Sequence, residues 1–509
     1  MRHPYAVLGV LVVVYVFNFL DRQILSILAE RIRADLGLSD AQIGFLYGTA
    51  FAVFYATFGI PLARLADVWD RRRLIAIGLA AWSLMTAVSG LARSFPQLAA
   101  ARFGVGIGEA SATPAAFSLL SDYFPAARRA TALAIYSSGI YIGAGVGLGI
   151  GGLIVDRWDT AWAGTPAPFG LHGWQVAFFA VGLPGLLLAL VVRTLHEPVR
   201  GAADGVVAPR EAAPFRAFVR ELGAVLPPFT LVHLARAGAG ATPVVVNLLA
   251  AAGAAGAAVL LTRLLGNPAQ WIALGTGLYA ACSWAQALAL RDRVAFTLIF
   301  RTRAMRSVAL AFACLAFTGY AIGFWTPPFF VRVHGADEAH VGLILGGTSA
   351  AAGWIGATLG GVAADRWRRA NPCGRLYVAM LTATLPLPFA VWMLTTPNTA
   401  LAYALNVPLL ILQSSWLGAG ASTVQDLVLP RMRAIASAAY LLVLTFIGLA
   451  LGPYVVGRLS VAYGLRNAML IGLSANVVAL LLAALASRHL ARDEATRLER
   501  ARAAGERGV

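Results

Sequence analysis

Apolar stretches long enough to cross a lipid bilayer recur along the whole chain. A helix that crosses the hydrocarbon core needs about 20 mostly apolar residues. Stretches of this kind form two sets of six, at 6–28, 41–63, 74–92, 95–120, 130–154 and 174–193, and at 305–331, 340–363, 376–395, 399–424, 435–458 and 465–487. Only 12% of the residues are charged, compared with about 25% in soluble domains. The sequence therefore predicts an all-α integral membrane protein and excludes a soluble enzyme.

The segment between the two sets contains further apolar runs. Residues 194–221 form a polar connector, and prolines and glycines interrupt 222–240, so we expect an interfacial segment there and not a span. Runs at 243–262 and 269–290 predict two inserted spanning helices, which makes about fourteen spans in all. The expected parts are an N-terminal six-helix bundle (1–193), a cytoplasmic linker with the two inserted helices (194–303), a C-terminal six-helix bundle (304–487) and a cytoplasmic tail (488–509).

The distribution of arginine supports this topology. The chain has 40 Lys and Arg residues, all of them arginine, against 23 acidic residues. With the N-terminus inside, most of these arginines fall on the cytoplasmic side, which is the usual bias of membrane proteins. We therefore expect a multi-pass protein of a bacterial inner membrane with both termini in the cytoplasm. The positive charge does not indicate nucleic-acid binding, because no basic stripe is interleaved with aromatic residues.

Two expected spans carry ionisable side chains at membrane depth. The first span contains Asn18, Asp21 and Arg22, and the fourth contains Arg102 and Glu109. Such charges are costly in hydrocarbon and normally face an interior partner or water. The rise of the helices places Asp21 and Arg102 at similar depth, so Asp21 could pair with Arg102 and leave Glu109 in an apolar, glycine-rich setting.

This arrangement suggests a proton site. A carboxyl group without a cationic partner in a low-dielectric setting favours its protonated form, whereas one beside arginine stays ionised. Glu109, and Asp21 when it loses its arginine, are therefore candidate proton carriers. The alternative is a static buried ion pair that only fixes helix packing.

The ends of two corresponding spans resemble each other. Residues 59–73 (GIPLARLADVWDRRR) and 357–369 (ATLGGVAADRWRR) both place small residues, an aspartate and an arginine cluster at an inner helix end. Tandem halves are typical of transporters built from pseudo-symmetric bundles, although two basic loops can also be alike by chance. The candidate inner-gate residues are Asp67, Arg71, Arg72, Arg73, Asp365 and Arg366.

Other patterns indicate neither catalysis nor a cofactor. The glycines at 104–108 and 139–152 lie inside apolar spans, so they favour close helix packing and not a phosphate loop. The stretch HEPVR at 196–200 lacks the second histidine of a zinc motif, and no nucleophile–base set stands out. We expect no enzyme activity, metal or cofactor.

Polar and aromatic residues of several spans are candidates to line a cavity, with ordinary packing or an interfacial aromatic belt as the alternative. They are Asn18, Tyr320, Trp325, Thr326, Phe329, Gln413 and Trp416.

Several stretches carry a resemblance to a known family. They are NFLDR (18–22), GVGIGEAS (104–111), LLSDYFP (119–125) and ALGPYVVG (450–457), together with the loop at 67–73. The chain resembles the major facilitator superfamily, and within it the spinster-like branch, over most of its length except about 200–300 and the tail after 488. The resemblance implies a major facilitator fold of two six-helix bundles around a central cavity.

The resemblance also implies roles for particular residues. The coupling and substrate-site charges would be Asp21, Arg22, Arg102 and Glu109, and the loop at Asp67 and Arg71–Arg73 would help to close the inner gate. Spinster-like proteins are associated with export of lysophospholipids or sphingoid phosphates. Val68 stands where the loop motif usually has arginine, so we expect gate closure to depend on Arg64 or Asp70.

The expected function is therefore proton-coupled secondary transport by alternating access. The expected partners are protons, membrane lipid and an amphiphilic anionic solute, lysophospholipid- or sphingolipid-like, whose head group meets Arg22 or Arg102. We expect a monomer. One alternative is a proton-coupled transporter of a small organic anion such as an aromatic acid, and another is a membrane receptor or scaffold that transports nothing.

Overall fold

The computed structural model describes residues 3–200, 213–226, 229–236 and 240–506. All regular secondary structure in these ranges is helical. Eleven helices or helix pairs there are long and apolar enough to cross a membrane. The other three expected spans, at 74–92, 95–120 and 269–290, are also helical. The all-α membrane architecture is confirmed, and the number of fourteen spans stays a prediction.

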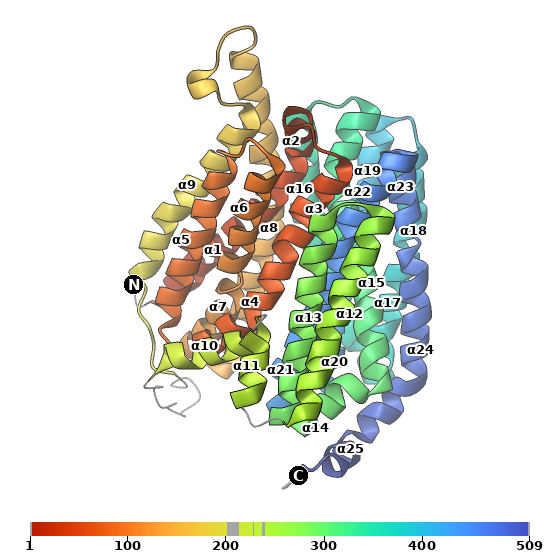
Figure 1. Cartoon of the computed structure of the whole chain (residues 1–509). Helices are drawn as coiled ribbons and strands as arrows, with labels where there is room; N and C mark the ends of the chain where they lie inside the picture. Colours follow the sequence, from red (N-terminus) through yellow and green to blue (C-terminus); the bar gives the residue numbers. More distant parts are fainter. Residues whose placement is uncertain (1–2, 201–212, 227–228, 237–239, 507–509) are drawn as a thin grey trace. The chain divides into compact units, whose positions relative to one another are not determined.

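The described residues form two compact units, Met1–Leu222 with Thr326–Ala351, and Gly223–Trp325 with Ala352–Val509. The domain boundaries expected from the sequence stay predictions. The first unit contains α1 (Pro4–Ile27), α2 (Ala29–Leu36), α3 (Asp40–Tyr47), α4 (Thr49–Val68), α5 (Arg71–Ser89), α6 (Phe95–Glu109), α7 (Ala112–Tyr123), α8 (Ala126–Ala161), η1 (Pro168–Gly170) and α9 (Gly173–Arg193). Within it α1 packs along α8, α5 along α9, and α4 against α6 (Figure 1).

The remaining helices begin in the linker and continue to the C-terminal end. They are α10 (Pro214–Val225), α11 (Phe229–Arg236), α12 (Ala241–Leu265), α13 (Pro268–Arg291), α14 (Arg293–Phe296), η3 (Thr297–Arg301), α15 (Arg303–His334), α16 (Glu338–Ala370), α17 (Gly374–Thr384), α18 (Pro386–Thr395), α19 (Thr399–Ser414), α20 (Leu417–Asp426), η4 (Pro430–Met432), α21 (Arg433–Val443), η5 (Leu444–Leu451), α22 (Gly452–Tyr463), α23 (Leu465–Gly472), α24 (Ala475–Ala495) and α25 (Arg497–Ala503). The described residues of 222–240 belong mainly to the end of α10 and to α11, and the interfacial position expected for this segment stays a prediction. The helices α15 and α16 run through both units.

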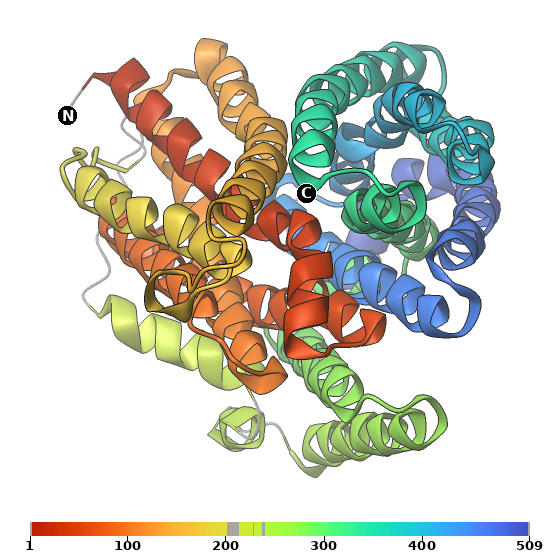
Figure 2. The ribbon, with the colours of Figure 1, turned by 90° about the horizontal axis from the view of Figure 1, so that it is seen from above.

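The two inserted helices form a hairpin within the second unit. α12 and α13 lie side by side in both views (Figure 1, Figure 2). Gly266 and Asn267 join them with φ values of 73° and 54°, a left-handed conformation that suits these two residue types. The turn is anchored on α22, where the Asn267 amide donates to the Tyr454 hydroxyl at 3.3 Å and Trp271 meets the Tyr454 ring edge-on at 5.5 Å.

Glycine allows helices of the first unit to approach closely. A Cβ atom at Gly145 of α8 would lie 2.4 Å from the carbonyl oxygen of Gly346 in α16, and one at Gly143 would lie 2.3 Å from that of Val16 in α1. No side chain fits at such distances, so the backbones themselves are in contact. This confirms the expected packing role of the glycines at 139–152.

The fourth expected span is broken in the middle. α6 ends at Glu109 and α7 begins at Ala112. Pro114 has no N–H to bond the carbonyl of Ala110, which removes one helical hydrogen bond at this point. The Ser111 hydroxyl donates to the Gly108 carbonyl at 2.8 Å. The break places the Glu109 carboxyl group at the end of a helix within the span.

The glycines of α6 fix its distance from two neighbouring helices. A Cβ atom at Gly106 would lie 2.5 Å from the Phe51 carbonyl of α4. At Gly104 and Gly108 it would collide with Met85 and Trp82 of α5. α6 therefore fits between α4 and α5 only because these positions lack side chains.

We expect Gly106→Ala to destabilise the protein by about 1–3 kcal/mol, because the methyl group would press on the α4 backbone. Thermal unfolding of the purified protein measures the effect. Gly9→Ala is the matched control, since a Cβ atom at Gly9 meets nothing within 4 Å. Equal stability of the two variants would contradict the close α4–α6 packing.

Candidate functional site

Four charged side chains meet inside the first unit. Asp21 and Arg22 come from α1, and Arg102 and Glu109 come from α6. Asp21, Arg102 and Glu109 have an exposed fraction of 0%, and Arg22 one of 9%. The structure therefore brings together the four residues that the sequence singled out.

The pairing differs from the expectation. Arg22 Nε donates to Glu109 Oε2 at 2.7 Å, so Glu109 has a cationic partner. Arg102 Nη1 donates to the backbone carbonyl of Asp21 at 3.3 Å and makes no ion pair with its carboxylate in the described residues. The expected Asp21–Arg102 side-chain pair is thus wrong. Consecutive residues project about 100° apart on a helix, so Asp21 and Arg22 face different neighbours.

Aromatic rings surround the Arg22 guanidinium. Its central carbon lies 4.3 Å from the ring centroid of Phe51, 4.8 Å from that of Tyr55 and 4.9 Å from that of Phe19. Such rings attract a cation through their negative faces, and the attraction grows when water is excluded. The three rings therefore stabilise the Arg22 cation in addition to its ion pair with Glu109.

Polar atoms around these charges are incompletely hydrogen-bonded. Among the described residues, both carboxylate oxygens of Asp21, both amide atoms of Asn18 and Oε1 of Glu109 are buried without a hydrogen-bond partner. Thr86 and Trp82 of α5 lie beside Asp21, and their hydroxyl and indole N–H groups are placed to donate to its carboxylate. More than about 90% of buried polar groups are normally satisfied, so this cluster has unused capacity to bind a proton, water or a polar solute.

The cavity candidates of the second half mostly fit packing roles. Trp325 and Phe329 are 0% exposed, and the Trp325 indole donates to the Pro453 carbonyl at 2.9 Å. Trp416 packs against Phe312 with ring centroids 6.1 Å apart. Thr326 and Gln413 are also buried, whereas Tyr320 is half-buried. That these residues line a cavity stays a prediction.

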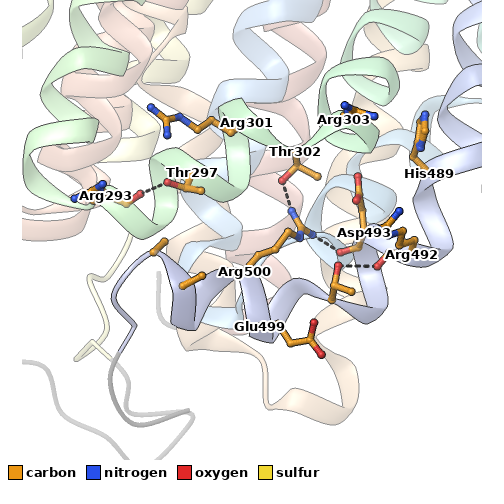
Figure 3. Close-up of a pocket in the computed structure, with 13 residues that line it drawn as sticks. Arg293, Thr297, Arg301, Thr302, Arg303, His489, Arg492, Asp493, Glu499 and Arg500 are labelled. Atoms are coloured by element: carbon orange, nitrogen blue, oxygen red, sulfur yellow. Dashed lines mark hydrogen bonds between the residues drawn. The ribbon is translucent and has the colours of Figure 1, made fainter.

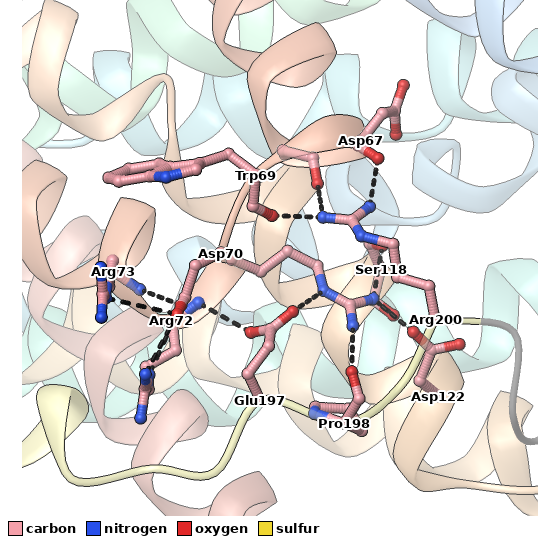
Figure 4. Close-up of polar contacts among 12 residues, drawn as sticks. Asp67, Trp69, Asp70, Arg72, Arg73, Ser118, Asp122, Glu197, Pro198 and Arg200 are labelled. Carbon is pink, nitrogen blue, oxygen red and sulfur yellow. Dashed lines mark hydrogen bonds and ion pairs between the residues drawn. The ribbon is translucent and has the colours of Figure 1, made fainter. Parts of the chain in front are cut away.

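Arg71, one of the predicted gate residues, is the centre of an ion cluster at the start of α5, whose partners Ser118, Asp122, Glu197 and Pro198 are labelled in Figure 4. Its guanidinium is 1% exposed and pairs with Glu197 at 2.7 Å and with Asp122 at 2.5 Å. The same group donates to the carbonyl oxygens of Ser118 and Pro198. Arg71 therefore ties α5 to α7 and to the segment after α9.

Arg200 closes the end of α4 in this cluster. Its guanidinium donates to the carbonyl oxygens of Ala66, Asp67 and Trp69 (Figure 4). A cation at a helix C-terminus satisfies carbonyls that have no partner within the helix. Burial, together with the nearby Arg71 charge, lowers the pKa of the Arg200 guanidinium from its usual value.

This cluster includes three residues that the sequence did not single out, Asp122, Glu197 and Arg200. The expected dependence of gate closure on Arg64 or Asp70 stays a prediction. Asp70 caps α5, where its carboxylate accepts the Arg73 backbone N–H at 2.9 Å. The signal for Glu197 and Arg200 in the sequence was HEPVR, in which two opposite charges flank a proline directly after the sixth span.

The second unit repeats the arrangement around Arg71. Arg375, at the start of α17, pairs with Asp426 at the end of α20. The two residues are 51 positions apart, as are Arg71 and Asp122. The predicted gate residue Asp365 makes a longer contact with Arg375, at 3.6 Å, and its side chain is largely exposed. Arg366, the other gate residue predicted here, makes no ion pair within the described residues.

A second ion cluster, also missed from the sequence, lies at the other end of the first unit. Arg332 of α15 pairs with Glu30 and with Asp40, each at 2.6 Å. Arg31 of α2 pairs with Glu338 of α16 at 2.9 Å. These pairs tie the end of α15 and the start of α16 to α2 and α3.

Comparison with known proteins gives consistent matches. A sequence model of the Major Facilitator Superfamily matches residues 11–453. An MFS-type efflux pump of Mycolicibacterium smegmatis is 28% identical over 466 residues, which is 90% of this chain and 85% of the pump. A probable L-galactonate transporter of Escherichia coli is 31% identical over 175 residues, 34% of this chain and 35% of that protein. A crystal structure of a bacterial homologue of the human lysosomal transporter Spinster, inward-facing and unoccupied, matches with a TM-score of 0.72 and 26% identity, covering 96% of this chain and 98% of that one.

We expect Arg71→Gln to cost about 3–5 kcal/mol of stability, because it leaves two partly buried carboxylates without their cation. Asp122→Asn in the same background should recover part of the loss. Arg73→Gln is the control: its side chain is 62% exposed, so we expect a change within about 0.5 kcal/mol. Chemical or thermal unfolding measures the change in stability. Equal effects at both positions would show that the ion cluster around Arg71 does not stabilise the protein.

Proposed function

Because the chain belongs to the Major Facilitator Superfamily, within its spinster-like branch, we propose that it is a proton-coupled secondary transporter. The chain is a multi-pass membrane transporter and not an enzyme. The proposed solute is amphiphilic and anionic, lysophospholipid- or sphingolipid-like, and is moved by alternating access. The observation that carries the proposal is the buried Arg22–Glu109 ion pair beside the unpaired carboxylate of Asp21.

The proposed coupling is a competition for Arg22. When Glu109 is ionised, it occupies the guanidinium at 2.7 Å. Protonation removes the charge of Glu109 and weakens this contact, so Arg22 becomes available to an anionic head group. Proton and solute then favour the same arrangement, in which Arg22 is released from Glu109, and a ligand shifts a conformational equilibrium by its differential affinity for the two states.

Asp21 is the proposed second proton carrier. Its carboxylate is fully buried and makes no ion pair among the described residues. A charge in this setting needs a cation, and Arg102 contacts only the backbone of Asp21. Movement of Arg102 away from Asp21 would favour proton uptake by the carboxylate.

The surroundings of Arg22 support an amphiphilic solute. Phe19, Phe51 and Tyr55 surround the cation, so an anion that reaches Arg22 meets apolar surface at the same place. A head group and a hydrocarbon chain together match this pairing of charge and rings. Similarity to an efflux pump and to a bacterial homologue of the transporter Spinster is compatible with export of such a molecule.

A small organic anion is the second candidate solute. The matching relative described as a probable L-galactonate transporter favours a compact carboxylate that binds at Arg22 or Arg102. Both candidates use the same charges and differ in the length of the apolar part. A receptor or scaffold without transport has no comparable support. We further propose a bacterial inner-membrane location and cytoplasmic termini, on the arginine bias of the sequence. The expectation of a monomer stays a prediction.

Flux in liposomes tests the coupling. With an imposed proton gradient, we expect Glu109→Gln and Asp21→Asn each to lower gradient-driven solute flux about tenfold or more, because neither amide can carry the proton. Asp156→Asn in α8 is the control, since Asp156 is half-buried and makes no ion pair within the described residues. Unchanged flux in both site variants would refute proton coupling at this cluster.

Binding to the purified protein separates the two solute classes. We expect a lysophospholipid to raise the midpoint of thermal unfolding at concentrations where aromatic or sugar acids do not. The effect should disappear in Arg22→Gln, because the head group loses its cation. Stabilisation by the short acids alone would establish the second candidate instead.

A further inference from the structure

A basic hollow lies in the second unit between the segment that follows the inserted helices and the last helices of the chain (Figure 3). Its volume is about 740 Å³. α14, η3 and the start of α15 form one wall, and the end of α24 with α25 forms the other. The charged side chains at this hollow are Arg293, Arg301, Arg303, Arg492 and Arg500, with His489 beside them and with Asp493 and Glu499 as the acids.

The acids do not neutralise these arginines. Asp493 is already engaged, because its carboxylate accepts the backbone N–H of Ala304 at 2.9 Å and so caps α15. Arg500 donates to the Thr302 hydroxyl at 2.5 Å and to the Asp493 backbone carbonyl. Burial lowers the pKa of Arg500, against the raising effect of Asp493. Arg500 is therefore held in place as a cation by neutral acceptors.

The remaining cations of the hollow have no acidic partner. Arg293, Arg303 and Arg492 make no ion pair among the described residues, and Arg301 contacts only the Phe296 ring at 6.0 Å. All four are exposed at the hollow. The arginines outnumber the two acids of the hollow and repel one another, so the arrangement is stabilised when an anion binds between them.

Several other arginines at the same end of the unit are paired. Arg431 binds Asp292 at 2.6 Å and Glu506 at 2.5 Å. Arg368 binds Glu494, and Arg375 binds Asp426. Single exposed arginines such as Arg366 also lack an ion pair within the described residues, but the hollow gathers four of them around one concave site. This concentration of unpaired cations is what favours a binding site.

The position of the hollow matches the depth of lipid head groups. It lies at the ends of two candidate spans, Arg303–His334 and Leu465–Ala495. The arginine bias predicts that these ends face the cytoplasm, where anionic lipids attract basic residues close to the membrane. Guanidinium groups suit phosphate oxygens, since their planar donors can bind two at once.

We propose that this hollow binds the phosphate group of an anionic lipid, and that the lipid joins the start of α15 to α24 and α25. The recognition is of phosphate oxygens by Arg303, Arg492 and Arg500. A soluble phosphate compound could use the same chemistry, so the experiment separates the two sources. The proposal does not depend on the transported solute, because its readout is binding and not flux.

The test uses the full-length protein in a nonionic detergent and the double variant Arg303→Gln/Arg492→Gln. Both residues are exposed and without ion pairs in the described chain, so the variant should unfold at the wild-type temperature when no lipid is added. We expect phosphatidylglycerol to bind the wild type and the double variant to bind it about tenfold more weakly. Native mass spectrometry or thermophoresis measures the affinity.

A control variant and two further ligands complete the experiment. Arg216→Gln/Arg369→Gln removes the same charge from exposed sites elsewhere and should bind phosphatidylglycerol as the wild type does. Phosphatidylcholine, whose phosphate is balanced by choline, should bind weakly. Displacement of phosphatidylglycerol by pyrophosphate would support phosphate recognition. Pyrophosphate binding without phosphatidylglycerol binding would overturn the lipid as the source, and equal binding by wild type and double variant would overturn the site.

Discussion

A charge in hydrocarbon is tolerated where the protein supplies its partners, and in this chain the partners of Arg22 come from three helices. Glu109 reaches it from α6 at 2.7 Å, and aromatic rings reach it from α1 and α4. That geometry requires α6 to lie almost in backbone contact with α4, which the glycine at 106 permits. The ion pair, the ring cage and the glycine-lined face of α6 are therefore parts of one arrangement, since none of them is possible without the helix spacing that the others need.

The sequence predicted the spans and the buried charges because both depend on local composition. The rise per residue predicted that Asp21 and Arg102 lie at similar depth, and in the structure Arg102 contacts the Asp21 backbone. It failed on the pairing, because rotation of a helix about its axis is set by tertiary packing. Arg200 and Glu197 were missed for a related reason: they lie in a connector without periodicity, and their partners at the ends of α4 and α5 are more than 120 positions away.

The internal repeat was visible in the sequence, but the matching residues were not. The similarity between 59–73 and 357–369 rested on basic runs, and it pointed to Asp365 and Arg366. The structure shows the equivalence one helix later, where Arg71 and Arg375 each bind an aspartate 51 positions onward. Clusters of basic residues are common in loops, and their position along the chain can vary. An arginine that pairs with the end of the next span has less freedom, because the lengths of two helices set the number of residues between the partners. Pairs of opposite charge at equal spacing are thus a better guide to tandem halves than similar loops.

The inserted hairpin is attached to the second unit at both of its ends. Its turn is bound to α22 through Asn267 and Tyr454, and the residue after α13, Asp292, binds Arg431. Most of α12 is nevertheless exposed, and only 11% of its most apolar stretch is buried inside the protein. A fluorophore or spin label on the outer face of α12 would consequently travel with the second unit while leaving its packed interior undisturbed. The inserted hairpin is therefore a suitable labelling site for measuring the motion of the second unit during transport.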